Sequence, residues 1–338
     1  MATDLSVRGL RSGRPGATLF ACLLSVCLSC FMNPSATAQA YPNKPIRLIV
    51  AYPPAGGIDF VARVLGHTLG ENLKQQVVIE NRPGGAGLLG AIAAAKAVPD
   101  GYTIFAGDTR SLILNPVMER GQSYNPDKEF QVVALCAKFP MILVVNQRSE
   151  VKSVGEFIAL ARAQPGRMDY ASPGVGGPHH LAMEMLKRRA SIDLLHIPYK
   201  GAAPAVQDLI GGQVQAMFVD APAGMSQIRA GKLRPLAVAT EVRLAALPAI
   251  PTFADVGIDG FEAYAWVGIV VSLGVSRDIV ALLNQEVARA VKSDAVSRRF
   301  MDAGVEPVVS TPEQYAQLIR SEGEKWGVII SALGLKRE

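Results

Sequence analysis

The 338-residue chain contains only four cysteines, and three of them precede residue 40. Cys22, Cys27 and Cys30 lie in an apolar N-terminal segment, so removal of that segment would leave Cys136 alone. A single cysteine excludes an intramolecular disulfide in the rest of the chain. Cys136 stands in the apolar run VVALCAKF, which predicts a buried, unreactive thiol rather than a nucleophile.

The sequence also lacks a charge excess and long apolar runs. Beyond residue 40 it carries 31 basic and 28 acidic side chains, without a long basic block. This balance predicts no nucleic-acid partner. No apolar run after residue 40 approaches the roughly 20 residues that a membrane-spanning helix needs. We therefore predict a soluble mature protein.

Residues with catalytic or metal-binding chemistry are few. The histidines His67, His179, His180 and His196 show neither H-x-x-x-H spacing nor a cysteine cluster of the kind that zinc sites use. His180 is predicted to pack or hydrogen-bond beneath the loop that precedes it. Ser172 is followed by glycines but lacks the G-x-S-x-G turn that exposes a nucleophilic serine. We expect no catalytic residue, no metal and no cofactor.

The first 40 residues have the order of an export signal. Three arginines lie within the first 14 residues, an apolar stretch follows over 17–32, and the tripeptide AQA ends at Ala40. This order is typical of a secretory signal peptide. We predict cleavage after Ala40 and a periplasmic location. The alternative, lipid attachment at Cys30, fits the preceding residues CLS poorly.

The mature chain would begin with a strand, a glycine-rich loop and a helix. The apolar run Ile46–Tyr52 is followed by PPAGG at 53–57, and Asp59 then heads a helical pattern. A helix that begins behind glycines offers unpaired N–H groups and the positive end of its dipole to an anion. In an exported protein, this arrangement points to a receptor for an anionic solute.

Strand and helix patterns alternate along the rest of the chain. Short apolar strands between helices predict an α/β fold with mostly parallel sheets, covered on both faces. Val154–Ala163 is predicted as a helix capped by Ser153. The runs MILVVN and YAWVGIVV are candidates for the two strands of a hinge. This hinge would divide the mature chain into domain 1, residues 41–141 plus 265–338, and domain 2, residues 142–264.

Four places repeat the design of a strand that leads through small residues into a helix. They are Pro53–Asp59, Pro83–Gly87, Ser172–Pro178 and Lys200–Pro204. In open α/β sheets, ligands bind at the carboxyl ends of strands, where helix N-termini converge. The four loops are therefore predicted to line one cleft from both domains. The alternative for any single loop is a tight turn that glycine merely permits.

One of these loops runs into a literal G-x-G-x-x-G, from Gly85 to Gly90, and Asp108 ends the next strand. This outline matches the dinucleotide fingerprint and leaves a periplasmic nicotinamide-dependent oxidoreductase as an alternative. However, four residues separate the preceding strand from Gly85, and one of them, Pro83, cannot donate a hydrogen bond. We therefore favour a structural turn.

Longer motifs in the chain resemble a known family. They include YPNKPIRLIVAYPPAGGIDFVAR from Tyr41, VVIENRPGGAG, PGRMDYASPGVG and HIPYKGAAPAVQDLIGGQVQAMF. In order and spacing, they are similar to the Bug or TctC-like receptors of tripartite tricarboxylate transporters, from Tyr41 nearly to the C-terminus. The resemblance implies a two-domain, type II periplasmic binding fold that closes like a flytrap on a small carboxylate.

The resemblance also implies which loops meet the ligand. In the family, the loop here at 54–57 holds one carboxylate through backbone groups and ordered waters. The loops at 107–110 and 172–177 add contacts, and Asp220 approximates the family's strand-end acid. The predicted ligand-binding residues are Pro54, Ala55, Gly56, Gly57, Asp108, Thr109, Arg110, Ser172, Gly174, Val175, Gly176, Gly177, Tyr199, Lys200 and Asp220.

The chain departs from the family's pattern where the far end of the ligand should lie. Asp108 and Arg110 stand where small hydroxyl residues are common. Arg110 could bind a second carboxylate bidentately, and Asp108 could recognise an amine or a hydroxyl on the ligand. The alternative is a local ion pair between Asp108 and Arg110.

These observations predict a periplasmic solute-binding receptor without catalytic activity. Its ligand would be a di- or tricarboxylate, an acidic amino acid or an aromatic acid. Its partners would be the membrane permease subunits of a tripartite tricarboxylate-type transporter or, alternatively, a sensor kinase. We expect the receptor to be a monomer.

Overall fold

The computed structural model describes residues 41–118 and 125–335. The chain divides into two compact units, residues 1–43 and 44–338, and the fold below belongs to the second. The predicted signal peptide and the lipidation alternative at Cys30 lie outside the described residues. None of the helices in the described ranges combines the length and the apolar character needed to cross a membrane.

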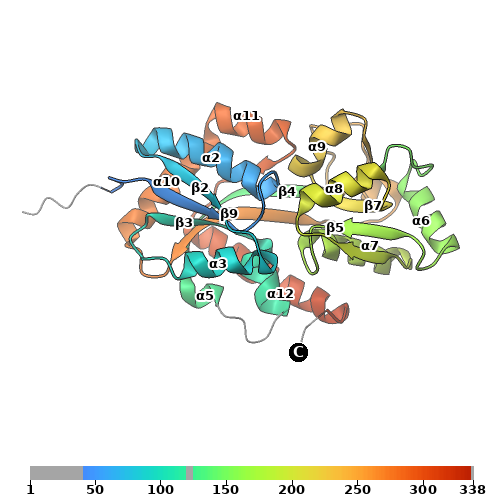
Figure 1. Ribbon diagram of the computed structural model, residues 1–338, viewed down its shortest axis with the longest axis horizontal. Coiled ribbons are helices and arrows are strands. Elements are labelled where there is room, and N and C mark those ends of the chain that lie inside the picture. The colour runs from blue at the N-terminus through green and yellow to red at the C-terminus, as the bar shows by residue number, and fades with distance from the viewer. Residues whose placement is uncertain (1–40, 119–124, 336–338) are drawn as a thin grey trace, which may run out of the picture. The chain divides into compact units, whose positions relative to one another are not determined.

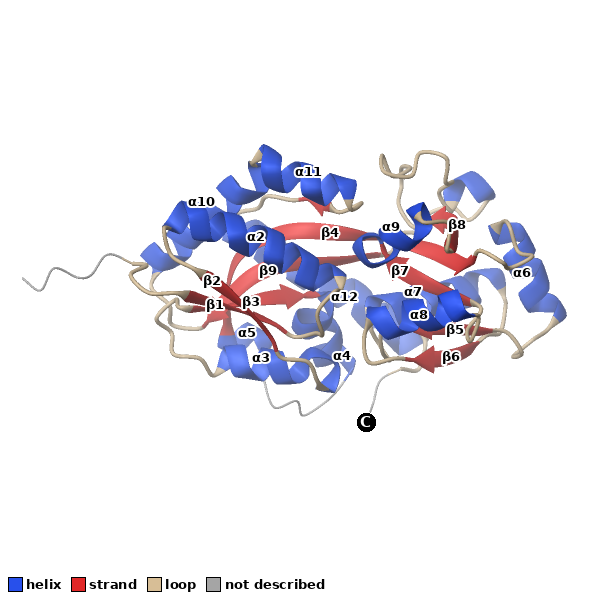
Figure 2. Cartoon of the chain, turned by 45° about the horizontal axis from the view of Figure 1, so that its top comes forward, coloured by secondary structure: helices blue, strands red, loops and turns tan. Residues whose placement is uncertain are grey.

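Residues 44–335 alternate strands and helices, as the sequence predicts (Figure 1, Figure 2). The strands are β1 (Ile46–Val50), β2 (Val77–Asn81), β3 (Thr103–Asp108), β4 (Phe130–Asn146), β5 (Asp169–Ser172), β6 (Leu195–Pro198), β7 (Ala216–Asp220), β8 (Leu233–Val238), β9 (Tyr264–Ser272) and β10 (Glu306–Pro307). The helices are α2 (Gly57–Leu73), α3 (Leu88–Ala95), α4 (Asn115–Met118), α5 (Pro126–Glu129), α6 (Val154–Ala163), α7 (Pro178–Ala190), α8 (Ala202–Gly211), α9 (Ala221–Arg229), α10 (Arg277–Lys292), α11 (Asp294–Asp302) and α12 (Pro312–Ala332). Short 3-10 or π turns are η1 (Gly85–Gly87), η2 (Arg110–Leu114) and η3 (Ala254–Val256).

In the described residues, ten strands form one sheet, and its first end is built from the N-terminal strands. β1 pairs in parallel with β2 and β3, and β9 then joins β3 and β4 in antiparallel pairings. Helices α2, α10 and α11 lie on one face of this end, and α3 and α5 lie on the other (Figure 1). Burial from both faces explains the nearly continuous apolar run of β1.

Strand β4 connects the two ends of the sheet. Residues Phe130–Pro140 pair with β9, whereas Met141–Asn146 pair with β7 and β8. β7, β5 and β6 then continue the sheet in parallel, with α7 and α8 packed on β5 and β7. The change of partner after Pro140 lies beside the start of β9 at Tyr264, close to the expected hinge. The domain boundaries themselves stay a prediction.

Each end of the sheet has its own apolar core. One core contains Phe105, Trp266 and Trp326, and the other contains Leu209 and Met217. Both therefore hold large, fully or almost fully buried side chains that fix the strands to the covering helices.

Two local predictions are confirmed. Helix α6 spans Val154–Ala163, and the Ser153 hydroxyl accepts a hydrogen bond from the Glu156 N–H at 3.2 Å. Cys136 is a buried free thiol, and burial raises its pKa to about 12. It is therefore not a nucleophile at neutral pH.

Gly268 leaves no room for a side chain where β9 crosses β4. A Cβ there would overlap the Ala134 carbonyl oxygen and come within 2.6 Å of the Tyr315 ring. We expect Gly268→Ala to lower the free energy of unfolding by about 2 kcal/mol. Gly327→Ala in α12, where a Cβ meets nothing within 4 Å, should instead raise it by up to about 1 kcal/mol. Urea denaturation measures both, and a Gly268→Ala protein as stable as the wild type would contradict this packing.

Candidate functional site

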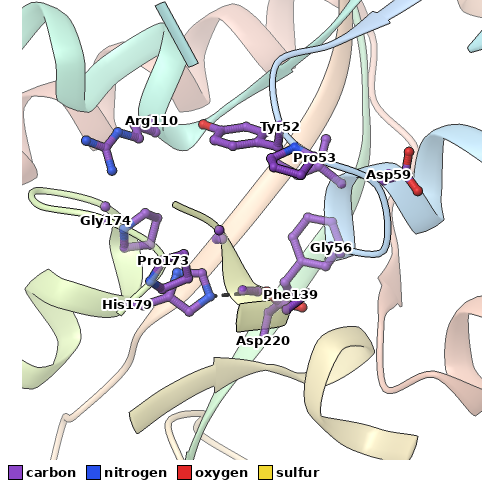
Figure 3. A pocket seen from close by; sticks show the side chains of 18 of the residues that line it. Tyr52, Pro53, Gly56, Asp59, Arg110, Phe139, Pro173, Gly174, His179 and Asp220 are labelled. Atoms are coloured by element: carbon purple, nitrogen blue, oxygen red, sulfur yellow. Dashed lines mark hydrogen bonds and ion pairs between the residues drawn. The ribbon is translucent and has the colours of Figure 1, made fainter. Parts of the chain in front are cut away.

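A pocket of about 100 Å³ lies where β4 changes partners (Figure 3). Phe139 of β4 and Ala265 of β9, which pair in register, form part of its wall. Because one water needs roughly 10–15 Å³, the pocket admits a small organic molecule. The lining residues are Tyr52, Pro53, Pro54, Gly56, Gly57, Ile58, Asp59, Arg110, Phe139, Pro173, Gly174, Gly177, Pro178, His179, Gly201, Ala202, Ala203, Pro204, Asp220 and Ala265.

Three helices begin at this pocket without a side-chain cap. α2 starts after Gly56, α7 after Gly177 and α8 after Gly201, and at none of these starts does a described side chain accept a hydrogen bond from the first turn. By contrast, α5, α6, α9, α10, α11 and α12 each begin with a side chain that does. The first-turn N–H groups of these three helices therefore have no capping side chain, and such groups are a common site for anions.

A buried carboxylate holds the loop before α2. Asp59 accepts hydrogen bonds from the Ala55 N–H at 3.0 Å, from Arg63 at 2.8 and 2.9 Å, and from Asn81 at 2.8 Å. Burial alone would raise the pKa of Asp59, but these bonds outweigh burial and lower the pKa. Asn81 also donates to the Tyr52 carbonyl at 3.0 Å. The loop is thus tied to the ionised form of Asp59.

Asp108 lies behind the pocket wall. Its buried carboxylate accepts hydrogen bonds from the Tyr52 hydroxyl at 2.8 Å, from the Ser111 N–H at 3.2 Å and from the Arg110 N–H at 3.3 Å. Burial raises the pKa of Asp108 in spite of these bonds. Tyr52 itself lines the pocket, so Asp108 positions the Tyr52 ring.

Arg110 lies at the edge of the pocket and extends to the loop after β5 (Figure 3). Its Nη2 donates to the Val175 carbonyl, and its Nε donates to Asn115 Oδ1 at 3.3 Å. Its Nη1 lies 3.0 Å from the position that a Cβ on Gly177 would take. Arg110 thus joins the two ends of the sheet, and its bond to Asp108 runs through its backbone N–H.

His179 and Asp220 form a pair on the pocket wall (Figure 3). His179 Nε2 lies 3.1 Å from Asp220 Oδ2, and because a carboxylate only accepts, Nε2 carries the hydrogen. Asp220 Oδ1 accepts from the Ala223 N–H at 3.0 Å, which caps α9. The same oxygen lies 2.7 Å from the position of a Cβ on Gly57, so Asp220 closely approaches the start of α2.

Stacked aromatic rings support the loop after β5. The Gly176 N–H donates to His180 Nδ1 at 2.9 Å, which confirms the predicted place of His180 beneath the loop. Ser172 Oγ lies 2.7 Å from His196 Nε2, and the two imidazole rings stack at 4.1 Å beside Tyr170. Burial lowers the pKa of both histidines to about 4. The loop therefore rests on neutral imidazoles.

The predicted ligand-binding residues divide into two groups in the structure. Those that line the pocket are Pro54, Gly56, Gly57, Arg110, Gly174, Gly177 and Asp220. Those beside or behind the lining are Ala55, Asp108, Thr109, Ser172, Val175, Gly176, Tyr199 and Lys200. Thr109 accepts from the Trp266 N–H at 3.0 Å, and the Tyr199 hydroxyl donates to Asp208 at 2.7 Å. Direct contact of any of these residues with a ligand stays a prediction.

The loop Pro83–Gly87 does not line the pocket, so the expectation that four loops share one cleft is wrong for this loop. A Cβ on Gly87 would lie 3.0 Å from the Tyr52 hydroxyl, and one on Gly90 would lie 2.7 Å from Ala51 Cα. These glycines of the G-x-G-x-x-G turn allow close packing against the residues directly after β1. In the described ranges, no three acidic, histidine or cysteine side chains form a group that could hold a metal ion.

Sequence reasoning missed several lining residues. Tyr52, Phe139, His179 and Ala265 are not among the predicted ligand-binding residues. The position of His179 directly after Gly177-Pro178 at a helix start was a usable signal. Phe139 and Ala265 carry no local signal, because their place depends on strand register.

An α/β fold with a pocket between the two ends of its sheet agrees with the fold of periplasmic solute-binding proteins. Residues 61–335 match the tripartite tricarboxylate transporter family receptor. Protein BugT of Bordetella pertussis is 35% identical over 301 residues, which cover 89% of this chain and 92% of BugT. The chain belongs to this receptor family.

Solved structures agree with this assignment. An R. palustris protein solved with adipate is 31% identical, with a TM-score of 0.85 over 87% of this chain and 98% of that one. MatC from Rhodopseudomonas palustris, solved with bound malate, is 29% identical, with a TM-score of 0.80 over 86% of this chain and all of that one. BugD, a periplasmic binding protein, is 28% identical with a TM-score of 0.83 over 88% of this chain and all of BugD.

The histidine stack predicts a loss of stability in acid. His180 and His196 stay neutral in the folded state down to a pKa of about 4, whereas unfolded histidines take up protons below about 6.5. Stability should therefore fall between pH 6.5 and 4, by several kcal/mol for the pair. His180→Gln should reduce the slope of stability against pH in this range. His67→Gln is the control, because the His67 side chain is 70% exposed. Urea midpoints measured from pH 8 to 4 test this, and equal pH slopes in all three proteins would contradict it.

Proposed function

We propose that this chain is a periplasmic receptor that captures a small organic carboxylate and presents it to the permease subunits of a tripartite tricarboxylate-type transporter. The observation that carries the proposal is the start of α2, α7 and α8 at one pocket without side-chain caps. Each start directs unpaired N–H groups and a positive dipole end toward the same space. The relatives solved with adipate and malate support a dicarboxylate.

The ligand would bind the pocket at two places. One carboxylate would lie at the loop 53–57, whose shape is set by Asp59. A second would lie near the guanidinium of Arg110, whose planar fork suits a bidentate carboxylate contact. This arrangement gives the departure from the family's pattern at Arg110 a role in recognition.

Binding would close two domains around a hinge formed by β4 and β9. We place domain 1 at 41–141 plus 265–338 and domain 2 at 142–264, as the sequence predicts. Gly57 lies against Asp220, Pro53 against Gly201, and Arg110 bonds Val175. Ligand entry would require these contacts to separate, as in other hinge closures.

The receptor would carry out no reaction on its ligand. Ser172 and His196 lie at the distance of a nucleophile and its base, but Ser172 is fully buried and neither residue lines the pocket. Their bond instead supports the loop after β5. The export that this function needs would come from the signal peptide that ends at Ala40.

A thermal-shift screen of residues 41–338 tests the proposal with malate, adipate, tricarboxylates, aromatic acids and nicotinamide dinucleotides. A ligand present at 100 times its Kd should stabilise the fold by about 2.7 kcal/mol. We expect a shift with carboxylates. A shift with a dinucleotide alone would contradict the proposal.

With the carboxylate that binds, Gly57→Val should lower affinity at least about 100-fold in calorimetry, because its side chain would strike the Asp220 carboxylate and cover the α2 N–H groups. Gly323→Val in α12 is the matched control, since a Cβ there meets nothing within 4 Å and Gly323 lies outside the pocket lining. Normal binding by Gly57→Val would mean that the loop 53–57 is only a turn and does not bind the carboxylate.

Arg110→Ala should weaken carboxylate binding by about 30-fold or more, because it removes the cation that faces the second carboxylate. Arg110→Lys keeps the charge but loses the planar fork, so its affinity for the carboxylate should lie between those of Arg110→Ala and the wild type. Calorimetry measures all three. Unchanged affinity in Arg110→Ala would mean that Arg110 does not contact the ligand and only bonds Val175.

A further inference from the structure

We infer that the pocket selects carboxylates without an amino group and that His179 enforces this selection. The inference rests on the proposed function and narrows its ligand class, which includes acidic amino acids. It follows from the acidic side chains at the pocket and from the donors that already occupy them.

Both oxygens of Asp59 are engaged by protein donors. Oδ1 accepts from Arg63 Nη2 at 2.9 Å and from Asn81 Nδ2 at 2.8 Å. Oδ2 accepts from the Ala55 N–H at 3.0 Å and from Arg63 Nε at 2.8 Å. The adjacent guanidinium also neutralises the charge of Asp59. The Asp59 carboxylate therefore has no lone pair left to accept a hydrogen bond from a ligand ammonium.

Asp220 is the other acid that lines the pocket, and its oxygens are also engaged. Oδ1 caps α9 through the Ala223 N–H at 3.0 Å, and Oδ2 accepts from His179 Nε2 at 3.1 Å. Both side chains are at most 12% exposed. A ligand ammonium that approaches Oδ2 would therefore compete with His179 for this oxygen.

Asp108, the acid proposed from sequence to recognise an amine, lies behind Tyr52. Its Oδ2 accepts from the Tyr52 hydroxyl and from the Arg110 N–H, and its Oδ1 accepts from Ser111. The pocket wall therefore separates Asp108 from the cavity.

The pocket thus offers donors to a ligand and keeps its carboxylates occupied. Uncapped helix starts and Arg110 suit groups that accept hydrogen bonds. An ammonium has three N–H donors and no acceptor, and a buried charge without a partner is costly. A hydroxyl can accept as well as donate, so a hydroxy acid fits where the matching amino acid does not.

Calorimetry on the wild-type protein tests the inference with two matched pairs, malate with aspartate and adipate with 2-aminoadipate. We expect the amino compound of at least one binding pair to bind about 100-fold more weakly or not at all. Equal affinity within every pair that binds would overturn the inference and leave the proposed function intact. Failure of both pairs and of all other carboxylates in the screen would overturn the proposed function and the inference with it.

Variants of His179 test the selecting residue. His179→Ala releases Asp220 Oδ2, so affinity for the amino compound should rise at least about 10-fold relative to its partner. His179→Gln keeps a side-chain N–H donor and should discriminate as the wild type does. Asp220→Asn added to His179→Ala should cancel the gain. If His179→Ala discriminates as sharply as the wild type while folding normally by circular dichroism, His179 is not the selecting residue.

Discussion

The pairing of strand β4 with two sets of partners determines where the pocket lies. Phe139 is among its last residues opposite β9, and Met141 is its first opposite β7, directly across from Asp220. The sheet therefore places side chains from both of its ends around one point. The loops that leave β1, β5 and β6 meet there, although more than 100 residues separate the first from the others.

At this meeting point α2, α7 and α8 start without a side-chain cap, as α3 does elsewhere, whereas α9 starts there with Asp220 as its cap. Glycine at Gly56, Gly177 and Gly201 replaces the Ser, Thr, Asn or Asp caps of six other helices. Exchange of such a cap for glycine costs only a few tenths of a kcal/mol. Solvent can satisfy the open N–H groups until an anion takes its place. The positive ends of three helices are thereby kept available at a small cost in stability.

The sequence could predict the features that are encoded locally. Helix α6 follows from Ser153 and the pattern after it, and the loop 53–57 follows from its glycines and the strand before them. The sequence could not predict which loops converge, because that depends on strand order and register between distant segments. Pro83–Gly87 has the same local design as the pocket loops, yet its Gly87 packs closely against Ala51 and Tyr52, directly after β1. Phe139 enters the pocket only through its pairing with Ala265.

The surroundings of the charged side chains also depend on distant segments and not on the local sequence. Asp108 and Arg110 are close in sequence, which suggested an ion pair or a shared role, but their side chains have different surroundings. Asp108 is directed into the protein against Tyr52 and Ser111, whereas Arg110 extends to Val175 on the opposite loop. Burial holds the pKa of His180 at about 4, so the support under that loop adds no charge at neutral pH. With Asp59 held by Arg63, the other ionisable side chains in the lining are Arg110 and the pair formed by His179 and Asp220. The polarity of the pocket therefore depends on which acids already have donors, and that is a property of the folded chain rather than of its composition.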